Sequence, residues 1–403
     1  MNIFKPIAQI FFVIIFFSTL QAKNLDKFNE GSYISDYFSG ILLLNDNQYN
    51  ESYSFLKKLD GLEESHLNYS SRYLYSLVNL GKLNEAFNYS KKLEKRKLDN
   101  FESDLIIGVY YLKNKNHDLA QKYFLKLQNR QSSSILNNFV SNALLNWVGF
   151  KNLDLNSAQN KINVIDSRFE NLKNIQNVFL HCFYKSQKTE FFFEELVLNK
   201  KIDFSRYNYF YAKYLLNIGK IEKAKKVVNS SIELYPRNLL LNQYKIDLII
   251  EKNFESSFDC KKQSNVVAEI LYITANAFSS QSMYSLSNFY LNLSKYLNEN
   301  FYSFNTLLAE NFYKIENFEK SKKIYDKMKK QGAAYQWYAA KQKVKILLKE
   351  NKNDEAIKLM SDSYKKLVYK NVYDTFDFAE FLKRNKKYLP FITKHIEIIN
   401  PKI

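Results

Sequence analysis

Small residues recur along the chain at a fixed distance, and a large residue precedes each of them by nine positions. The small residues Ser52, Ala86 and Ala120 lie 34 residues apart, as do Ser287 and Ser321, and Ala356 follows 35 residues later. The preceding large residues are Leu43, Leu77, Tyr111, Leu215, Phe278, Phe312 and Leu347. The 403 residues include only eight glycines and four prolines, too few for many strands joined by tight turns. The pattern therefore predicts an all-α chain with an internal repeat.

Each period can be interpreted as two antiparallel helices joined by a turn. Small residues occupy the eighth and twentieth places of a unit, where two helices come closest: Gly40 with Ser52, Gly108 with Ala120, Ala212 with Ala224, Ala275 with Ser287, and Ala309 with Ser321. A larger side chain at either place would separate the helices. Gly81 and Gly219 fall at the fifteenth place, where a left-handed C-cap suits glycine. Pro236 falls at the thirty-second place, where the second helix must end.

From residue 33 to about 399 this repeat resembles the tetratricopeptide repeat (TPR) family. The best units begin at Tyr33, Leu67, Phe101, Ser205, Ala268, Tyr302 and Trp337, whereas those near Phe139, Leu172 and Asn371 depart further. The resemblance implies a right-handed α-solenoid of about nine to ten TPR-like hairpins. Ala224 and Ser287 are 63 residues apart, short of two periods, which predicts a loop or break at 253–265 between solenoid segments 23–252 and 266–403. The layout, with "GSY" at 31–33 opening the first unit, is also similar to exported bacterial TPR proteins.

The first 22 residues have the features of a secretory signal peptide. Lys5 supplies a positive charge, an apolar run follows from Ile7 to Leu20, and Ala22 is a small residue suited to cleavage. An uncleaved membrane anchor is the alternative, although the run is shorter than the roughly 20 residues that span a bilayer. We expect a mature chain that begins near Lys23, has no transmembrane segment and is located in the periplasm.

The two cysteines lie in different surroundings. Cys182 is in the apolar stretch "VFLHCFYK" and Cys260 in the polar stretch "SSFDCKKQ", so one is expected to be buried and the other exposed. We therefore predict that they do not pair, although an exported chain would permit a disulfide. Their spacing is not that of metal ligands.

Motifs for catalysis are not found in the sequence. The four histidines are scattered, and there is no HExxH, GxSxG, phosphate-binding loop or CxxC. The adjacent acidic pairs Glu63–Glu64 and Glu194–Glu195 point about 100° apart on a helix and make no carboxylate dyad. We predict that the chain is not an enzyme and binds no cofactor or metal.

The net charge of +18 has two interpretations. A bias toward Lys, Asn, Ile, Phe and Tyr codons would produce it without selection for binding, whereas an acidic peptide or a lipid headgroup would explain it as a function. Export argues against a nucleic-acid partner.

The thirteenth place of the units faces the groove in TPR folds, and here no aliphatic residue occupies it. The candidate groove residues at this and adjacent first-helix places are Asn45, Asn79, Lys113, Tyr209, Asn217, Lys314, Lys341, Lys345, Lys349 and Lys383. Asn amides can bind a peptide backbone and Lys can pair with carboxylates. Lys341, Lys345 and Lys349, spaced by four, are predicted to form one basic stripe. The alternative is that Lys and Asn are simply favoured near helix C-termini.

We therefore expect a periplasmic scaffold or adaptor that binds a protein or peptide in its concave groove, in the setting of envelope assembly. Two alternatives stay open. One is a basic protein that binds anionic lipid or cell-wall glycan, and the other is an accessory subunit of an envelope enzyme.

Overall fold

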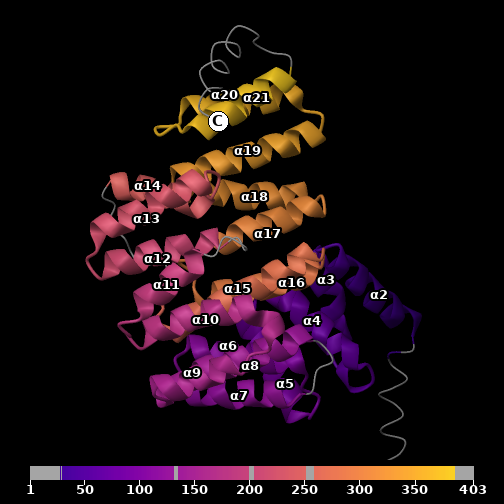
Figure 1. The fold of residues 1–403 in the computed structure, drawn as a ribbon. Coiled ribbons are helices and arrows are strands. Elements are labelled where there is room, and N and C mark those ends of the chain that lie inside the picture. Colours follow the sequence, from indigo (N-terminus) through magenta and orange to yellow (C-terminus); the bar gives the residue numbers. More distant parts are fainter. Residues whose placement is uncertain (1–27, 29, 131–134, 199–203, 251–257, 386–403) are drawn as a thin grey trace, which may run out of the picture. The chain divides into compact units, whose positions relative to one another are not determined.

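The computed structural model describes residues 28, 30–130, 135–198, 204–250 and 258–385 (Figure 1). Every regular element in these residues is helical. The predicted all-α fold of TPR-like hairpins is confirmed. The predicted signal peptide at 1–22 lies outside the described residues.

Consecutive helices of 8 to 18 residues alternate with short turns along the chain. The helix pairs are α2 (Gly31–Asn45) and α3 (Tyr49–Leu56), α4 (Leu67–Asn79) and α5 (Leu83–Lys95), α6 (Phe101–Lys113) and α7 (His117–Asn129), α8 (Ile135–Gly149) and α9 (Leu155–Asn163), α10 (Glu170–Phe183) and α11 (Thr189–Val197), α12 (Ser205–Asn217) and α13 (Ile221–Leu234), α15 (Gln263–Ser280) and α16 (Tyr284–Leu297), α17 (Ser303–Lys314) and α18 (Phe318–Met328), and α19 (Ala333–Lys349) and α20 (Asn353–Lys365). Among the described residues, α14 (Leu239–Ile249) and α21 (Val372–Arg384) have no second helix after them.

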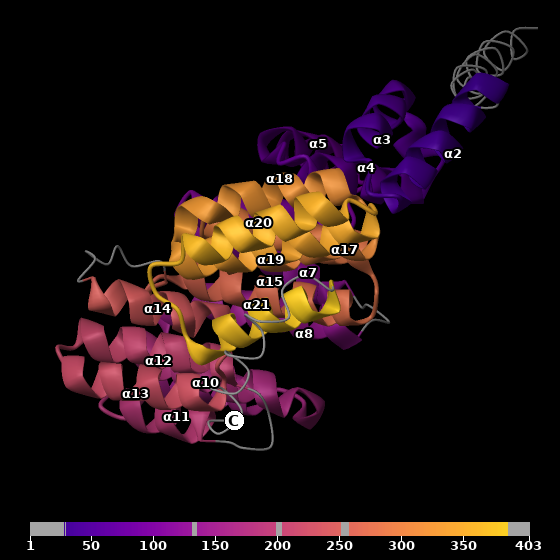
Figure 2. The ribbon, with the colours of Figure 1, turned by 90° about the horizontal axis from the view of Figure 1, so that it is seen from above.

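The helices belong to two compact units. Unit 1 contains the described residues up to Val148 together with Ile273–Leu293, and unit 2 contains Gly149–Tyr272 together with the described residues from Ser294 onward. Within unit 2, α17 to α20 pack one after another (Figure 1), and they overlap when seen from above (Figure 2). The expected division at 253–265 stays a prediction, since residues 251–257 lie outside the described part of the chain.

The small residues at the eighth and twentieth places lie where the two helices of a hairpin cross. Ser52, Ala120, Ala224 and Ser321 are all completely buried. A Cβ added to Gly108 would lie 2.3 Å from the Phe124 ring, so only glycine fits there. The serines also make a hydrogen bond that size alone does not require. Ser52 Oγ donates to the Gly40 carbonyl at 2.8 Å. At the equivalent places of a later unit, Ser321 Oγ donates to the Ala309 carbonyl at 2.9 Å.

The turn inside the hairpins is built in one repeated way. The residue at the fifteenth place has a left-handed φ of about 57–80° in Asn47, Gly81, Lys115, Gly219, Ser282, Glu316 and Asn351. The next backbone N–H then donates to the carbonyl of the large residue at the eleventh place, as in Lys82 to Leu77 at 2.9 Å and Lys352 to Leu347 at 2.8 Å. This is the hydrogen bond of a Schellman C-cap. Glycine marks only two of these turns, so the sequence reveals the repeated conformation only in part.

The prediction that the two cysteines do not pair is wrong. Cys182 and Cys260 form a disulfide with their Cα atoms 5.9 Å apart, within the range normal for such bonds. The polar stretch around Cys260 gave no sign of this, because the pairing depends on its neighbour Phe258. That ring is buried between Phe179 of α10 and Phe210 of α12, with centroid distances of 5.1 and 4.4 Å. Packing of Phe258 carries Cys260 to the end of α10.

A buried ion pair fixes the start of α15 inside unit 2. Arg206 of α12 donates to both oxygens of Glu269, from Nε at 2.7 Å and from Nη2 at 2.8 Å. The Glu269 side chain is fully buried, and the guanidinium lies 4.0 Å from the Tyr272 ring centroid. Removing one of the two charged side chains would leave the other charge buried without a partner. The pair therefore holds two segments that are 63 residues apart in the sequence.

We expect Ala224→Trp to destabilise unit 2 by about 1–3 kcal/mol, because the side chain would wedge α12 away from α13. Lys225→Trp, at the exposed neighbouring position, is the control and should change stability by less than about 0.5 kcal/mol. Urea unfolding of the two variants measures both effects. Equal unfolding curves for Ala224→Trp and the unaltered protein would contradict this assignment of the hairpin crossing.

Candidate functional site

The candidate groove residues of unit 1 are in part covered by the chain itself. Asn79 Oδ1 accepts a hydrogen bond from Asn292 Nδ2 of α16 at 3.1 Å, and the Tyr75 ring meets the Phe289 ring edge-on at 4.8 Å. One turn earlier on α16, the fully buried Asn288 donates to the Tyr49 hydroxyl at 2.9 Å. The first-helix face around Asn79 thus holds α16. No local sequence signal indicates this packing, because the paired residues are more than 200 positions apart.

Other candidate residues occupy a range of environments. In unit 1, Asn45 is exposed and Lys113 is half-buried. In unit 2, Asn217, Lys314, Lys345 and Lys383 are exposed, whereas Tyr209 is buried with its ring edge-on to Tyr244 at 5.2 Å. Within unit 2, Tyr209 therefore lies in the interior, whereas Asn217, Lys314, Lys345 and Lys383 lie at the surface.

The predicted basic stripe on α19 is partly neutralised by neighbouring helices. Lys341 Nζ lies 2.6 Å from Asp377 Oδ2 of α21, and Lys349 Nζ lies 3.1 Å from Glu316 Oε1 in the turn after α17. Lys345, between them, is exposed. The sequence showed the lysines at helical spacing but not the acids, which come from other units.

A cavity of about 90 Å³ lies beside Lys341 in unit 2. Its walls come from the end of α13, from α14, α19 and α21, and from the segment that precedes α21; they include Arg237, Asn242, Trp337, Tyr338, Lys341, Tyr369, Asn371, Tyr373, Asp374 and Asp377. Four aromatic rings and charges of both signs thus surround one opening. Of the predicted site residues, Lys341 alone lines this cavity.

Asp377 is the centre of the charges in this cavity. Arg237 Nη2 lies 2.7 Å from one carboxylate oxygen and Lys341 Nζ lies 2.6 Å from the other. Burial alone would raise the pKa of Asp377, but Lys341 and Arg237 outweigh burial and lower it. The two cations also lie over aromatic faces, Arg237 over Tyr373 at 5.5 Å and Lys341 over Trp337 at 5.4 Å. Asp377 is therefore ionised at neutral pH and fixes both cations.

Asp374 and Trp337 contribute two further polar groups to the wall of the cavity. Burial raises the pKa of Asp374, opposed by the Asn371 backbone N–H, by Lys341 and by the indole of Trp337. Trp337 is only 4% exposed, and its Nε1 makes no hydrogen bond of ordinary geometry. An indole N–H is a donor that usually finds a partner when buried. The Trp337 N–H and a carboxyl of raised pKa thus lie near each other at the wall of the cavity.

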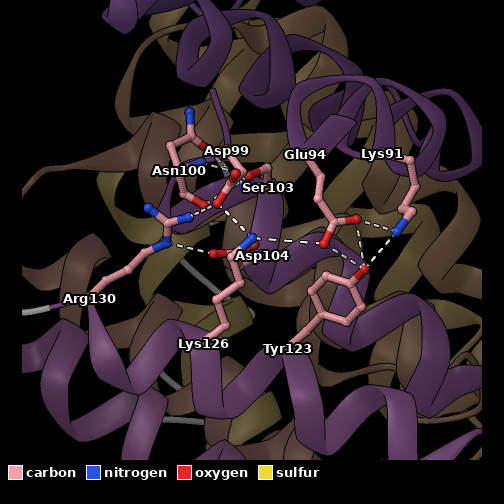
Figure 3. Close-up of polar contacts among 9 residues, drawn as sticks. All are labelled: Lys91, Glu94, Asp99, Asn100, Ser103, Asp104, Tyr123, Lys126 and Arg130. Carbon is pink, nitrogen blue, oxygen red and sulfur yellow. Dashed lines mark hydrogen bonds and ion pairs between the residues drawn. The ribbon is translucent and has the colours of Figure 1, made fainter. Parts of the chain in front are cut away.

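The densest polar cluster of unit 1 lies across α5, α6 and α7 (Figure 3). Lys126 Nζ lies 2.6 Å from Asp99 Oδ2 and 3.2 Å from the fully buried Asp104, and Arg130 pairs with the same two carboxylates. In the same cluster, the Tyr123 hydroxyl donates to Glu94 at 2.8 Å.

This cluster contains as many cations as carboxylates. Its acids are Glu94, Asp99 and Asp104, and its cations are Lys91, Lys126 and Arg130. Burial favours a higher pKa for Asp99, but Lys126 and Arg130 outweigh it and lower the pKa. Because every charge has a partner, we interpret the cluster as a contact that holds neighbouring repeats together.

Within the described residues, no group of three His, Cys, Asp or Glu side chains is arranged to hold a metal ion. Of the described helices, none combines the length and apolar character needed to cross a membrane.

Comparison with known proteins gives matches to solved structures alone. No protein-family model and no curated protein matches the chain. Yeast Tom70 is 12% identical over 92% of this chain and 99% of its own, with a TM-score of 0.26. The TPR domain of P58(IPK) is 14% identical over 88% of this chain and 99% of its own, with a TM-score of 0.25. Human IFIT1, solved as a dimer with PPP-AAAA, is 16% identical over 90% and 86%, with a TM-score of 0.27. The TPR-like hairpins described above rest on the helices and turns of this chain itself.

We expect Lys341→Gln to lower the free energy of unfolding by about 1 kcal/mol, because Asp377 loses one of its two cations. Lys345→Gln, one turn further along α19 and exposed, is the matched control and should have an effect near zero. Since the native pKa of Asp377 is lowered, its contribution to stability is present above the ordinary pKa of 3.8 and is lost as the pH falls through the native value. The difference between Lys341→Gln and the unaltered protein should therefore shrink below about pH 4. A difference that is constant from pH 7 to pH 3 in urea unfolding would contradict the assignment.

Proposed function

We propose that this chain is a non-enzymatic scaffold that binds a protein or peptide partner, and that it acts in the periplasm after export. The observation that carries the first part is the cavity beside Lys341, Asp377 and Trp337. There, open space, aromatic faces and the buried Trp337 N–H, which makes no hydrogen bond of ordinary geometry, occur together.

The size and lining of the cavity suit one side chain of a partner. A volume of about 90 Å³ has room for a small group. Rings of Trp337, Tyr338 and Tyr373 supply apolar contact, and the Trp337 N–H supplies a donor for an incoming oxygen. Such a mixture of aromatic area and few polar anchors is typical of the centres of protein interfaces.

The hairpin architecture supports a scaffold role over a catalytic one. Consecutive hairpins stack into a long surface on which each repeat contacts its neighbours. The ion pairs of unit 1 join repeats to each other (Figure 3), and α16 covers the face around Asn79. These interactions leave the cavity in unit 2 as the best-supported partner site.

The proposal of a periplasmic location is supported by two features. The apolar run of residues 7–20 precedes small Ala22, as in a secretory signal peptide. The Cys182–Cys260 disulfide is of a kind that persists in oxidising compartments and is rare in the cytosol. An exported scaffold of this kind has a natural setting in envelope assembly.

Site-specific photo-cross-linking in cells tests the partner site. Tyr369 lines the cavity and is 42% exposed, and Tyr302 is a matched position in the same unit, 44% exposed and absent from the cavity lining. With a photoreactive phenylalanine analogue at each position, we expect a discrete protein adduct from position 369 and none from position 302. Adducts of equal yield at both positions, or adducts to lipid or glycan alone, would contradict the proposed partner site.

Fractionation and N-terminal sequencing test export. We expect the mature protein to begin near Lys23 and to be released with the soluble periplasmic contents. A protein that retains Met1 and sediments with membranes would instead support the uncleaved anchor.

A further inference from the structure

The disulfide Cys182–Cys260 joins two positions that differ in access to solvent. Cys182, in the last turn of α10, is 2% exposed, whereas Cys260 lies in the turn before α15 and is partly exposed. Cys260 is therefore the more accessible of the two residues. Thiol–disulfide exchange depends on such access as well as on the thiolate fraction of the attacking sulfur.

A second cavity adjoins this disulfide. It has a volume of about 50 Å³, and both cysteines, Lys213, Asp259 and Lys261 contribute to its walls. Lys213 is buried, and burial lowers its pKa, with Asp247 opposing the shift. Lys261 is exposed, and Lys262 follows it in the chain. Nearby cations favour the thiolate form of a cysteine, which is the reactive form.

The turn that carries Cys260 is held in place independently of the disulfide. The Asp259 side chain accepts a hydrogen bond from the Lys261 N–H at 2.9 Å, and the Asp259 N–H donates to Asn265 Oδ1 at 3.0 Å. Phe258 packs against Phe179, which lies one helical turn before Cys182 on α10. These contacts hold the turn at the end of α10 without the sulfur–sulfur bond taking part in them.

We propose that Cys260 is the thiol that exchanges with external disulfides and that Cys182 is the buried thiol that resolves the mixed disulfide. In the first step the Cys260 thiolate attacks one sulfur of a disulfide oxidant, forms a mixed disulfide and releases one thiolate of the oxidant. In the second step the Cys182 thiolate attacks Cys260 Sγ, forms the internal disulfide and releases the second thiolate. Two electrons pass to the oxidant, and the two thiol protons of the protein are given up to it or to solvent.

This assignment gives the disulfide a role beyond a static cross-link. The bond links two residues that are 78 positions apart in the sequence and connects α10 to the turn before α15. The linked segment includes α14, which has no second helix after it among the described residues. Unit 2 therefore reaches its cross-linked form only where a disulfide oxidant is present. The inference concerns sulfur chemistry alone, so it stands or falls independently of the partner site beside Trp337.

The full-length chain and glutathione disulfide test the proposal. With Cys182→Ser, we expect a glutathione adduct on Cys260 that forms at least about tenfold faster than the adduct on Cys182 in the Cys260→Ser variant, because the second sulfur is buried. Intact-mass spectrometry follows both rates, and circular dichroism checks that both variants are helical. Equal rates, or a faster reaction at Cys182, would overturn the assignment.

A second measurement needs no cysteine variant. After reduction of the unaltered protein, a brief pulse of an alkylating reagent followed by peptide mapping should label Cys260 well before Cys182. Labelling in the opposite order, or equal labelling of a chain that is still helical, would also overturn the proposal.

A charge control separates local cations from net charge. Lys261→Gln with Lys262→Gln should slow the reaction of Cys260 with glutathione disulfide several-fold. Lys225→Gln with Lys226→Gln removes the same charge from exposed positions on α13 and should leave the rate unchanged. Equal slowing by both pairs would show that net charge, and not the surroundings of Cys260, sets its reactivity.

Discussion

The close approach of two helix backbones inside each hairpin is the constraint on which the rest of the structure depends. It requires a small residue at the twentieth place, and Ser52, Ala120, Ala224 and Ser321 are buried completely there. Where the small residue is serine, its hydroxyl also bonds to the facing helix, as Ser52 does to the Gly40 carbonyl. In most of the described hairpins the turn after the first helix also has the same left-handed residue and C-cap, whereas the turn between α8 and α9 is a 3-10 turn without one. One local geometry therefore recurs in the described hairpins of both units.

The surroundings of α14 differ from those of the regular hairpins. Helix α14 begins a repeat, but among the described residues no second helix follows it. Its Gln243 side chain instead accepts a hydrogen bond from the Ala334 N–H at the start of α19, at 3.0 Å and 91 residues away. The cavity lies beside these helices, lined by Asn242 of α14 and Trp337 of α19. Helix α14 thus contacts α19 directly, and the cavity lies next to that contact.

Much of the fold could be predicted from the sequence because it depends on local spacing. The hairpin crossings at Gly40 and Ser52 or at Ala212 and Ala224 follow from a count of residues, and so does the end of α13 before Pro236. The left-handed turns at Lys115 and Glu316 could not be predicted, since the hairpin imposes that conformation on residues that do not favour it. Contacts between repeats that are distant in the sequence could not be predicted either. The residue pattern within a single helix predicts neither the contact of Asn79 with Asn292 nor that of Lys341 with Asp377.

The disulfide shows why the candidate site was harder to predict than the fold. The polar residues around Cys260 indicate exposure. One aromatic residue of this turn, Phe258, is nevertheless buried, and its packing against Phe179 places the turn beside α10. In the same way, the lysines of α19 indicate a basic surface, but acids from other helices neutralise two of them. The net charge of +18 is therefore a poor guide to where a partner binds. Fixed charges at short range matter more, because exposed charges are screened over about 8–10 Å at physiological salt while a carboxylate held between Arg237 and Lys341 is not. Recognition in this chain should accordingly depend on the shape and hydrogen bonding of the cavity beside Asp377 more than on the overall positive field.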